Sequence, residues 1–65
     1  MKISRMKLEL VQADRGMTAG QIAEKARVSR QNISTIKGRG TCAPATAAKL
    51  AKALGCDIKE IIGEE

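Results

Sequence analysis

The chain has 65 residues, of which 12 are Lys or Arg and 7 are Asp or Glu, and its net charge is +5. A chain of this length buries only about 60% of its unfolded surface, so we expect residues 1–65 to form a single domain with a small core. Phe, Tyr and Trp are absent, which excludes the aromatic platforms on which single-strand binders and many RNA binders stack unpaired bases.

The distribution of charge is more informative than its sum. Seven Lys and Arg lie between Lys25 and Cys56 with no acidic residue, whereas residues 57–65 hold four acidic residues and one Lys. This asymmetry favours one face that meets a polyanion, for which duplex DNA is the better candidate, although a solvated surface explains charge alone equally well. No apolar run approaches the about 20 residues of a membrane span, and no signal peptide precedes Lys2, so we expect a cytoplasmic protein.

Residues 4–14 have the pattern of a first helix. Ser4 is a residue type that caps helix N-termini. Four apolar residues fall in this helix at helical spacing, namely Met6, Leu8, Leu10 and Val11. Leu8 and Val11 form the inward pair, and Met6 with Leu10 makes a second strip. That strip is either part of the core or covered by a partner subunit, and we favour the core.

Thr18 and Gln21 form a capping box that starts a second helix. The inward positions of this helix are apolar: Ile22, Ala23 and Ala26. Ala23 is small enough for two steeply crossing helices to approach each other closely. A turn at Arg27 and Val28 follows, with Val28 filling the corner between the helices.

A third helix is predicted from its N-cap at Ser29 to Gly38, a residue type that ends helices in the left-handed conformation. Ile33 and Ile36 mark its buried side. At about 100° per residue, the opposite side and its flanks are entirely polar or cationic. The residues there are Arg30, Gln31, Asn32, Ser34, Thr35 and Lys37.

Residues 38–42 are expected to form a flexible basic loop, after which Pro44 suits the first turn of a fourth helix. The apolar set of that helix is Ala47, Leu50, Ala51 and Leu54, and Gly55 ends it. Asp57 and Glu60 make another capping box, which opens a short last helix containing Ile58, Ile61 and Ile62. No strand alternation is present, so the fold class is all-α, a compact bundle of five helices.

The stretch GMTAGQIAEKARVSRQNISTIKGRG resembles the helix-turn-helix of the phage-repressor-like Cro/C1 (XRE) regulators, with residues 18–38 as the motif. The matching positions are Ala23, Val28, Ser29, Ile33 and Ile36. The flanking helices are similar too, so the resemblance covers roughly residues 6–62. It implies a lambda-repressor-like DNA-binding domain of bacterial origin that binds duplex DNA as a homodimer, without a cofactor.

The resemblance also assigns roles to residues. Arg30, Gln31 and Thr35 match the positions with which the family reads base edges, and the Ser34 hydroxyl adds a contact to base or phosphate. For phosphates we expect the free N–H groups and positive dipole end at Thr18, Ala19 and Gly20. Beyond the recognition helix, Lys37, Arg39 and Thr41 are expected to hold the backbone, with Arg27 as a weaker candidate.

Several positions depart from the family pattern. Ala19 stands where relatives usually have a Gln that clamps a phosphate, and Gly20 weakens the first turn of the second helix. Arg27 stands where the turn usually has Gly, so it must adopt a left-handed conformation or make a different turn. The loop before Pro44 is shorter than usual.

Catalytic and metal-binding functions find little support. The chain has no His to activate a nucleophile, so we expect a non-enzyme. Cys42 and Cys56 cannot complete a zinc tetrahedron alone, and we interpret both as free thiols in a reducing compartment, without a bound metal.

The leading functional prediction is a sequence-specific transcriptional regulator, most simply a repressor that occupies an operator. One alternative is the antitoxin of a toxin–antitoxin pair, which binds its own operator and also a toxin. Another is a protein-interaction module whose basic face meets protein. The candidate dimer surfaces are the last helix, with Ile58, Ile61 and Ile62, and the strip of Met6 and Leu10.

Overall fold

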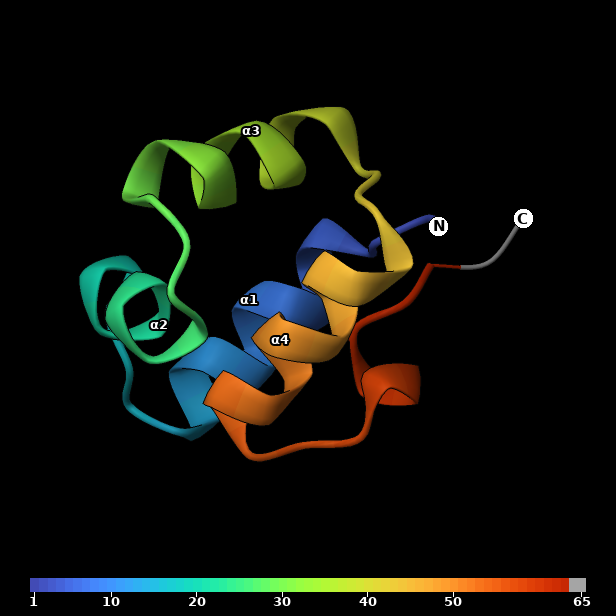
Figure 1. Ribbon diagram of the computed structural model, residues 1–65. Coiled ribbons are helices and arrows are strands. Elements are labelled where there is room, and N and C mark those ends of the chain that lie inside the picture. Colours follow the sequence, from blue (N-terminus) through green and yellow to red (C-terminus); the bar gives the residue numbers. More distant parts are fainter. Residues whose placement is uncertain (64–65) are drawn as a thin grey trace.

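A computed structural model describes residues 1–63, and within them the fold is all-α, as predicted. The helices are α1 (Arg5–Asp14), α2 (Ala19–Ala26), α3 (Arg30–Arg39) and α4 (Pro44–Leu54), followed by a single 3₁₀ turn, η1 (Ile58–Glu60) (Figure 1). The expected fifth helix is therefore shorter than predicted. Glu64 and Glu65, part of the acidic end, lie outside the described residues.

The predicted caps start the helices. The side-chain oxygens of Ser4, Thr18 and Ser29 accept hydrogen bonds from the backbone N–H groups of Lys7, Gln21 and Asn32. The capping box of Thr18 and Gln21 is complete, because the Gln21 side chain also accepts from the Thr18 N–H at 2.9 Å. Each cap satisfies donors that a helix N-terminus leaves without partners.

The end of α3 corrects one prediction. Gly38 does not stop the helix, which continues through Arg39, and Gly40 provides the left-handed cap with φ +71°. Arg39 therefore lies in the last helical turn and not in a flexible loop. Gly40 suits this role because it has no Cβ to clash in the left-handed conformation, and its N–H donates to the carbonyl of Ile36 at 2.7 Å.

The core lies between α4 and the elements around it, with Leu8, Ile22, Ile33, Leu50 and Ile61 as its largest fully buried side chains. α4 packs against α2 and η1, and small residues at the contact allow the close approach. The core assignment of Met6 and Leu10 is wrong, because their side chains are 70% and 62% exposed. α1 presents this strip to solvent because Leu8 and Val11 on its other side already supply the inward face.

The N-terminal segment is held between two distant parts of the chain. Isolated antiparallel bridges pair Lys2 with Thr41 and Ile3 with Ile62. The Ile3 N–H donates to the Gly40 carbonyl at 2.8 Å. These pairings connect the loop after α3 to the C-terminal segment.

Candidate nucleic-acid interface

One face of α3 is exposed to solvent. Ile33 and Ile36 anchor the helix with 1% and 3% exposure. The predicted base-contacting residues are all exposed on the side away from these two: Arg30, Gln31, Ser34 and Thr35. In Figure 1, α3 runs along one edge of the molecule with the other helices on a single side of it. The face can therefore meet a partner without rearrangement of the fold.

An internal hydrogen bond limits the contacts that the Thr35 side chain can make with a base edge. Its hydroxyl donates to the Gln31 carbonyl at 2.9 Å. With its hydrogen engaged, the hydroxyl oxygen is left as an acceptor, and the methyl group remains for apolar contact. Among base edges these groups suit the amino group of adenine or cytosine and the methyl group of thymine.

Arg30 lies against the start of α2. A Cβ placed on Gly20 would be 3.8 Å from Cδ and 3.9 Å from Nε of Arg30, which is ordinary van der Waals contact. The Arg30 stem therefore rests beside the first turn of α2. This packing brings a predicted base contact next to the predicted phosphate contacts.

The first turn of α2 presents free backbone donors. The capping box uses the N–H groups of Thr18 and Gln21. Ala19 and Gly20 occupy the next two positions, whose N–H groups have no partner within a helix. Together with the positive end of the helix dipole, these two donors suit an anion such as a phosphate.

The turn between α2 and α3 uses one of the two geometries anticipated for it. Arg27 is left-handed, with φ +58° and ψ +42°, and its N–H donates to the Glu24 carbonyl at 3.3 Å. Val28 packs against the core, and its N–H donates to the Ala23 carbonyl at 3.0 Å. The two helices thus meet through a tight turn, with the buried Ala23 nearby.

This geometry agrees with comparison to known families. Residues 7–64 match the family of Cro/C1-type HTH DNA-binding domains. The chain belongs to the Cro/C1-type helix-turn-helix family. It is therefore a DNA-binding regulator. Comparison with curated proteins found no match.

The Cro/C1-type domain keeps most of its positive charge unpaired. Within residues 1–63 the ion pairs are Arg5 with Glu9 at 3.1 Å and Arg15 with Asp14 at 3.8 Å. Both pairs involve α1 or the residue after it. Among these described residues, the Lys and Arg side chains of α2, α3 and α4 therefore form no ion pair.

The predicted phosphate contacts beyond α3 have different surroundings. Arg39 and Thr41 are exposed. Lys37 is half-buried, and its Nζ donates to Oε1 of Gln12 at 2.8 Å. Arg27 is exposed but lines a hollow of about 470 Å³ with Lys25, Lys49 and Lys52. None of the other predicted contacts lines this hollow.

Sequence reasoning missed Lys2 as a candidate contact. The bridge to Thr41 places this exposed residue beside the loop that follows α3. No local pattern could reveal it, since the pairing joins residues from opposite ends of the domain. Lys2 adds positive charge beside the predicted phosphate contact at Thr41.

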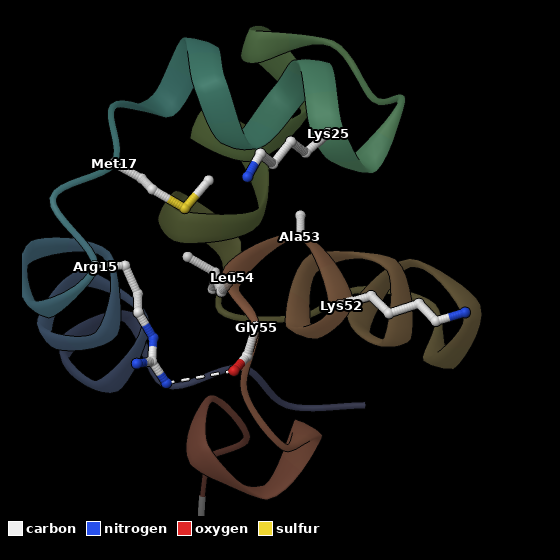
Figure 2. A pocket seen from close by; sticks show the side chains of 7 residues that line it. All are labelled: Arg15, Met17, Lys25, Lys52, Ala53, Leu54 and Gly55. Atoms are coloured by element: carbon white, nitrogen blue, oxygen red, sulfur yellow. Dashed lines mark hydrogen bonds between the residues drawn. The ribbon is translucent and has the colours of Figure 1, made fainter.

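The hollow in Figure 2 lies elsewhere, between the end of α1 and the facing ends of α2 and α4. It measures about 580 Å³, and Arg15 crosses it to donate from Nη2 to the Gly55 carbonyl at 3.3 Å. This bond satisfies a carbonyl at the end of α4. The Arg15 side chain in this hollow therefore has a structural role at the end of α4.

The two thiols are free and half-buried, and burial raises the pKa of both Cys42 and Cys56. Within residues 1–63 no three His, Cys, Asp or Glu come together as a metal site. None of the helices in that part of the chain has the length and apolar character to cross a membrane.

Proposed function

We propose that this domain is a sequence-specific transcriptional regulator that acts as a repressor, by occupying an operator in duplex DNA and denying it to polymerase. The observation that supports this proposal most directly is the exposed polar face of α3, whose opposite face is buried through Ile33 and Ile36. A helix of this width fits the major groove, where each base pair presents a distinct set of donors and acceptors.

Sequence choice comes from four side chains on that face. The Arg30 guanidinium forks onto O6 and N7 of guanine, and the Gln31 amide pairs with N6 and N7 of adenine. Thr35 adds its acceptor oxygen and methyl group, and Ser34 a hydroxyl contact. Each good bidentate pair contributes about 1–3 kcal/mol of discrimination against a wrong base.

Position and most of the affinity come from phosphate contacts. The proposed residues are Thr18, Ala19 and Gly20 at the start of α2, then Arg27, Lys37, Arg39 and Thr41. Ala19 and Gly20 contribute backbone donors, which suits the absence of the Gln clamp at Ala19. Because these contacts release condensed counterions, affinity should fall steeply as salt is raised.

A domain with a single recognition helix reads a short half-site, so we propose a homodimer on two inverted half-sites about 34 Å apart. Because a transcriptional regulator acts on the genome, we infer that this protein is located in the cytoplasm of a bacterium. Nothing in the proposed mechanism includes catalysis or a cofactor.

Selection of bound duplexes from a random pool tests the function. We expect enrichment of one sequence, bound at least about a thousandfold more tightly than its scrambled version at physiological salt. Equal affinity for both duplexes would contradict sequence-specific regulation. Absence of salt-dependent duplex binding would instead favour the protein-interaction module, and a toxin that co-purifies with the chain would favour the antitoxin.

A further inference from the structure

Positive charge gathers where the end of α2 faces α4. The hollow of about 470 Å³ at this place is lined by Lys25, Ala26, Arg27, Lys49 and Lys52. All of these except Ala26 are cationic and exposed. Among the described residues, no acidic one belongs to this lining. We call Lys25, Arg27, Lys49 and Lys52 the basic cluster.

The basic cluster has no counter-charge within the described fold. None of its members takes part in an ion pair within residues 1–63. A helix C-terminus favours a nearby cation, which accounts singly for Lys25 in the last turn of α2 and Lys52 in the last turn of α4. It does not account for four cations around one hollow. Because like charges in one place raise the local positive potential, the cluster attracts an anionic partner.

A mainly apolar hollow adjoins the basic cluster. It measures about 500 Å³ and lies between α4 and η1, and its lining includes two lysines of the cluster: Ala48, Lys49, Ala51, Lys52, Cys56, Asp57 and Ile58. Asp57 is its acidic member, and the Asp57 carboxylate accepts a hydrogen bond from the Lys59 N–H at 2.9 Å. Lys49 and Lys52 therefore stand between a basic hollow and an apolar one.

The hollow of about 580 Å³ in Figure 2 continues the same surface. Lys25 reaches it from α2 and Lys52 from α4 (Figure 2). Lys52 lines all three hollows, Lys25 lines this one and the basic one, and Lys49 lines the basic one and the apolar one. The three hollows are thus parts of one surface, which we call the α4 surface.

The α4 surface is distinct from the exposed face of α3. The three linings contain none of the predicted base contacts, Arg30, Gln31, Ser34 and Thr35. In Figure 1, α3 runs along the edge of the molecule and α4 lies on its inner side. Arg27 is the one predicted phosphate contact in these linings, so it marks the boundary between the two surfaces.

We propose that the α4 surface binds an acidic, amphipathic segment of a partner protein. Asp and Glu side chains of the segment lie against the basic cluster, which selects them by charge complementarity. Apolar side chains of the same segment enter the hollow between α4 and η1. A phosphate backbone matches the cations but has no apolar side chain for that hollow. The combination of the two hollows therefore favours a protein segment over a second duplex.

This partner goes beyond the proposed function. Apart from Arg27, the proposed operator contacts do not use the α4 surface. The partner segment therefore binds while α3 occupies DNA, and the domain connects a DNA site to a second protein.

Titration with a labelled synthetic peptide tests the surface. The probe peptide carries Leu on one face and Glu on the other at helical spacing. One matched peptide has Gln in place of Glu, and another has Ser in place of Leu. The domain should bind the Leu/Glu peptide at least about tenfold more tightly than either matched peptide. Absence of Leu/Glu binding, or equal binding of either matched peptide, would overturn the proposal.

Charge reversal locates the bound peptide. Lys49→Glu together with Lys52→Glu should lower the affinity for the Leu/Glu peptide at least about tenfold. The matched control is Lys2→Glu together with Lys7→Glu, at exposed positions outside the three linings. This control changes the net charge equally and should lose less than about twofold. Equal losses in the two double variants would overturn the proposal.

A peptide of reversed charge separates this effect from unfolding. The variant with Lys49→Glu and Lys52→Glu should bind a Leu/Lys peptide at least about tenfold more tightly than the unsubstituted domain does. An unfolded variant would not show this exchange of preference. Equal binding of the Leu/Lys peptide by both proteins would contradict the α4 surface as the binding site.

Competition with DNA separates this proposal from the proposed function. With an equimolar amount of the selected duplex bound, the affinity for the Leu/Glu peptide should stay within about threefold of its value for the free domain. Displacement of the peptide by the duplex would overturn the proposal and assign the α4 surface to DNA. Absence of any duplex preference, with peptide binding intact, would remove the proposed function and leave the α4 surface in place.

Discussion

Lys37 Nζ donates a 2.8 Å hydrogen bond to Oε1 of Gln12, which ties α3 to α1 across the domain. The bond engages a side chain that the sequence marks only as a free cation on the flank of the recognition helix. It therefore links the recognition helix directly to α1. Lys37 thus has both a structural bond and a proposed phosphate contact, and these roles can be separated.

Removal of the partner tests this separation. Gln12→Ala should lower the free energy of unfolding by about 1–2 kcal/mol, because it removes a part-buried hydrogen bond to a charged group. Duplex affinity should stay unchanged, since the Lys37 charge remains. Lys37→Met should lower stability by a similar amount and also weaken duplex binding. Thermal denaturation and duplex titration measure the two effects, and equal affinity losses in both variants would argue against a phosphate contact by Lys37.

Base and phosphate contacts should respond differently to truncation. Arg30→Ala and Gln31→Ala should each reduce the preference for the selected duplex over a scrambled one by about 1–3 kcal/mol. Arg39→Ala should weaken binding to both duplexes alike and reduce the salt dependence of the affinity by about one phosphate contact. Titrations on the two duplexes over a range of salt make the comparison. The same pattern of losses in all three variants would contradict this division of roles.

Gly20 offers a test of the first turn of α2. Because a Cβ there would make only ordinary contact with Arg30, Gly20→Ala should stabilise the domain by up to about 1 kcal/mol through helix propensity. Gly16→Ala is the opposite control, since Gly16 has φ +63° and the substitution strains the backbone. Thermal unfolding compares the two. A destabilising Gly20→Ala would mean that the first turn needs closer packing than these distances show.

Arg27 holds the one left-handed non-glycine conformation among the described residues. This conformation costs an L-residue about 1–2 kcal/mol, and Arg27→Gly removes that cost. Because glycine also increases the conformational entropy of the unfolded chain, the net rise in the free energy of unfolding should be up to about 1 kcal/mol. Arg27→Ala keeps the Cβ and should show no such gain. If Arg27 also contacts phosphate, both variants lose the same duplex affinity. Duplex titration of the two variants therefore measures the effect of the Arg27 charge, and their unfolding measures the effect of the turn conformation.

The thiols predict a dependence of stability on pH. Burial raises the pKa of Cys42 and Cys56 above the ordinary value of 9.0, so the folded state holds these protons more tightly than the unfolded state. The associated stability is present below pH 9 and is lost as pH rises through the folded-state pKa values. Denaturant unfolding at pH 8 and pH 10 should show a smaller fall for the variant with both Cys42→Ala and Cys56→Ala. An equal fall in both proteins would assign the effect to other groups.

Much of the local structure follows from the sequence alone. The caps at Ser4, Thr18 and Ser29 act within three residues, so a short stretch of chain contains all the information they need. The inward position of Ile33 and Ile36 follows from helical spacing, and with it the exposure of Gln31 and Thr35. For these reasons the helix-turn-helix, its polar face and the all-α fold could be predicted residue by residue.

The tertiary structure determines the features that depend on contacts between segments far apart in the chain. Spacing marks Met6 and Leu10 as apolar in the same way as Ile61, but Ile61 is fully buried whereas Met6 and Leu10 are exposed. The bond from Lys37 to Gln12 and the bridge from Lys2 to Thr41 join segments far apart in the chain, and no local pattern encodes either of them. Periodicity indicates only that a residue is suited to burial, whereas the packing of other elements against it determines whether it is buried.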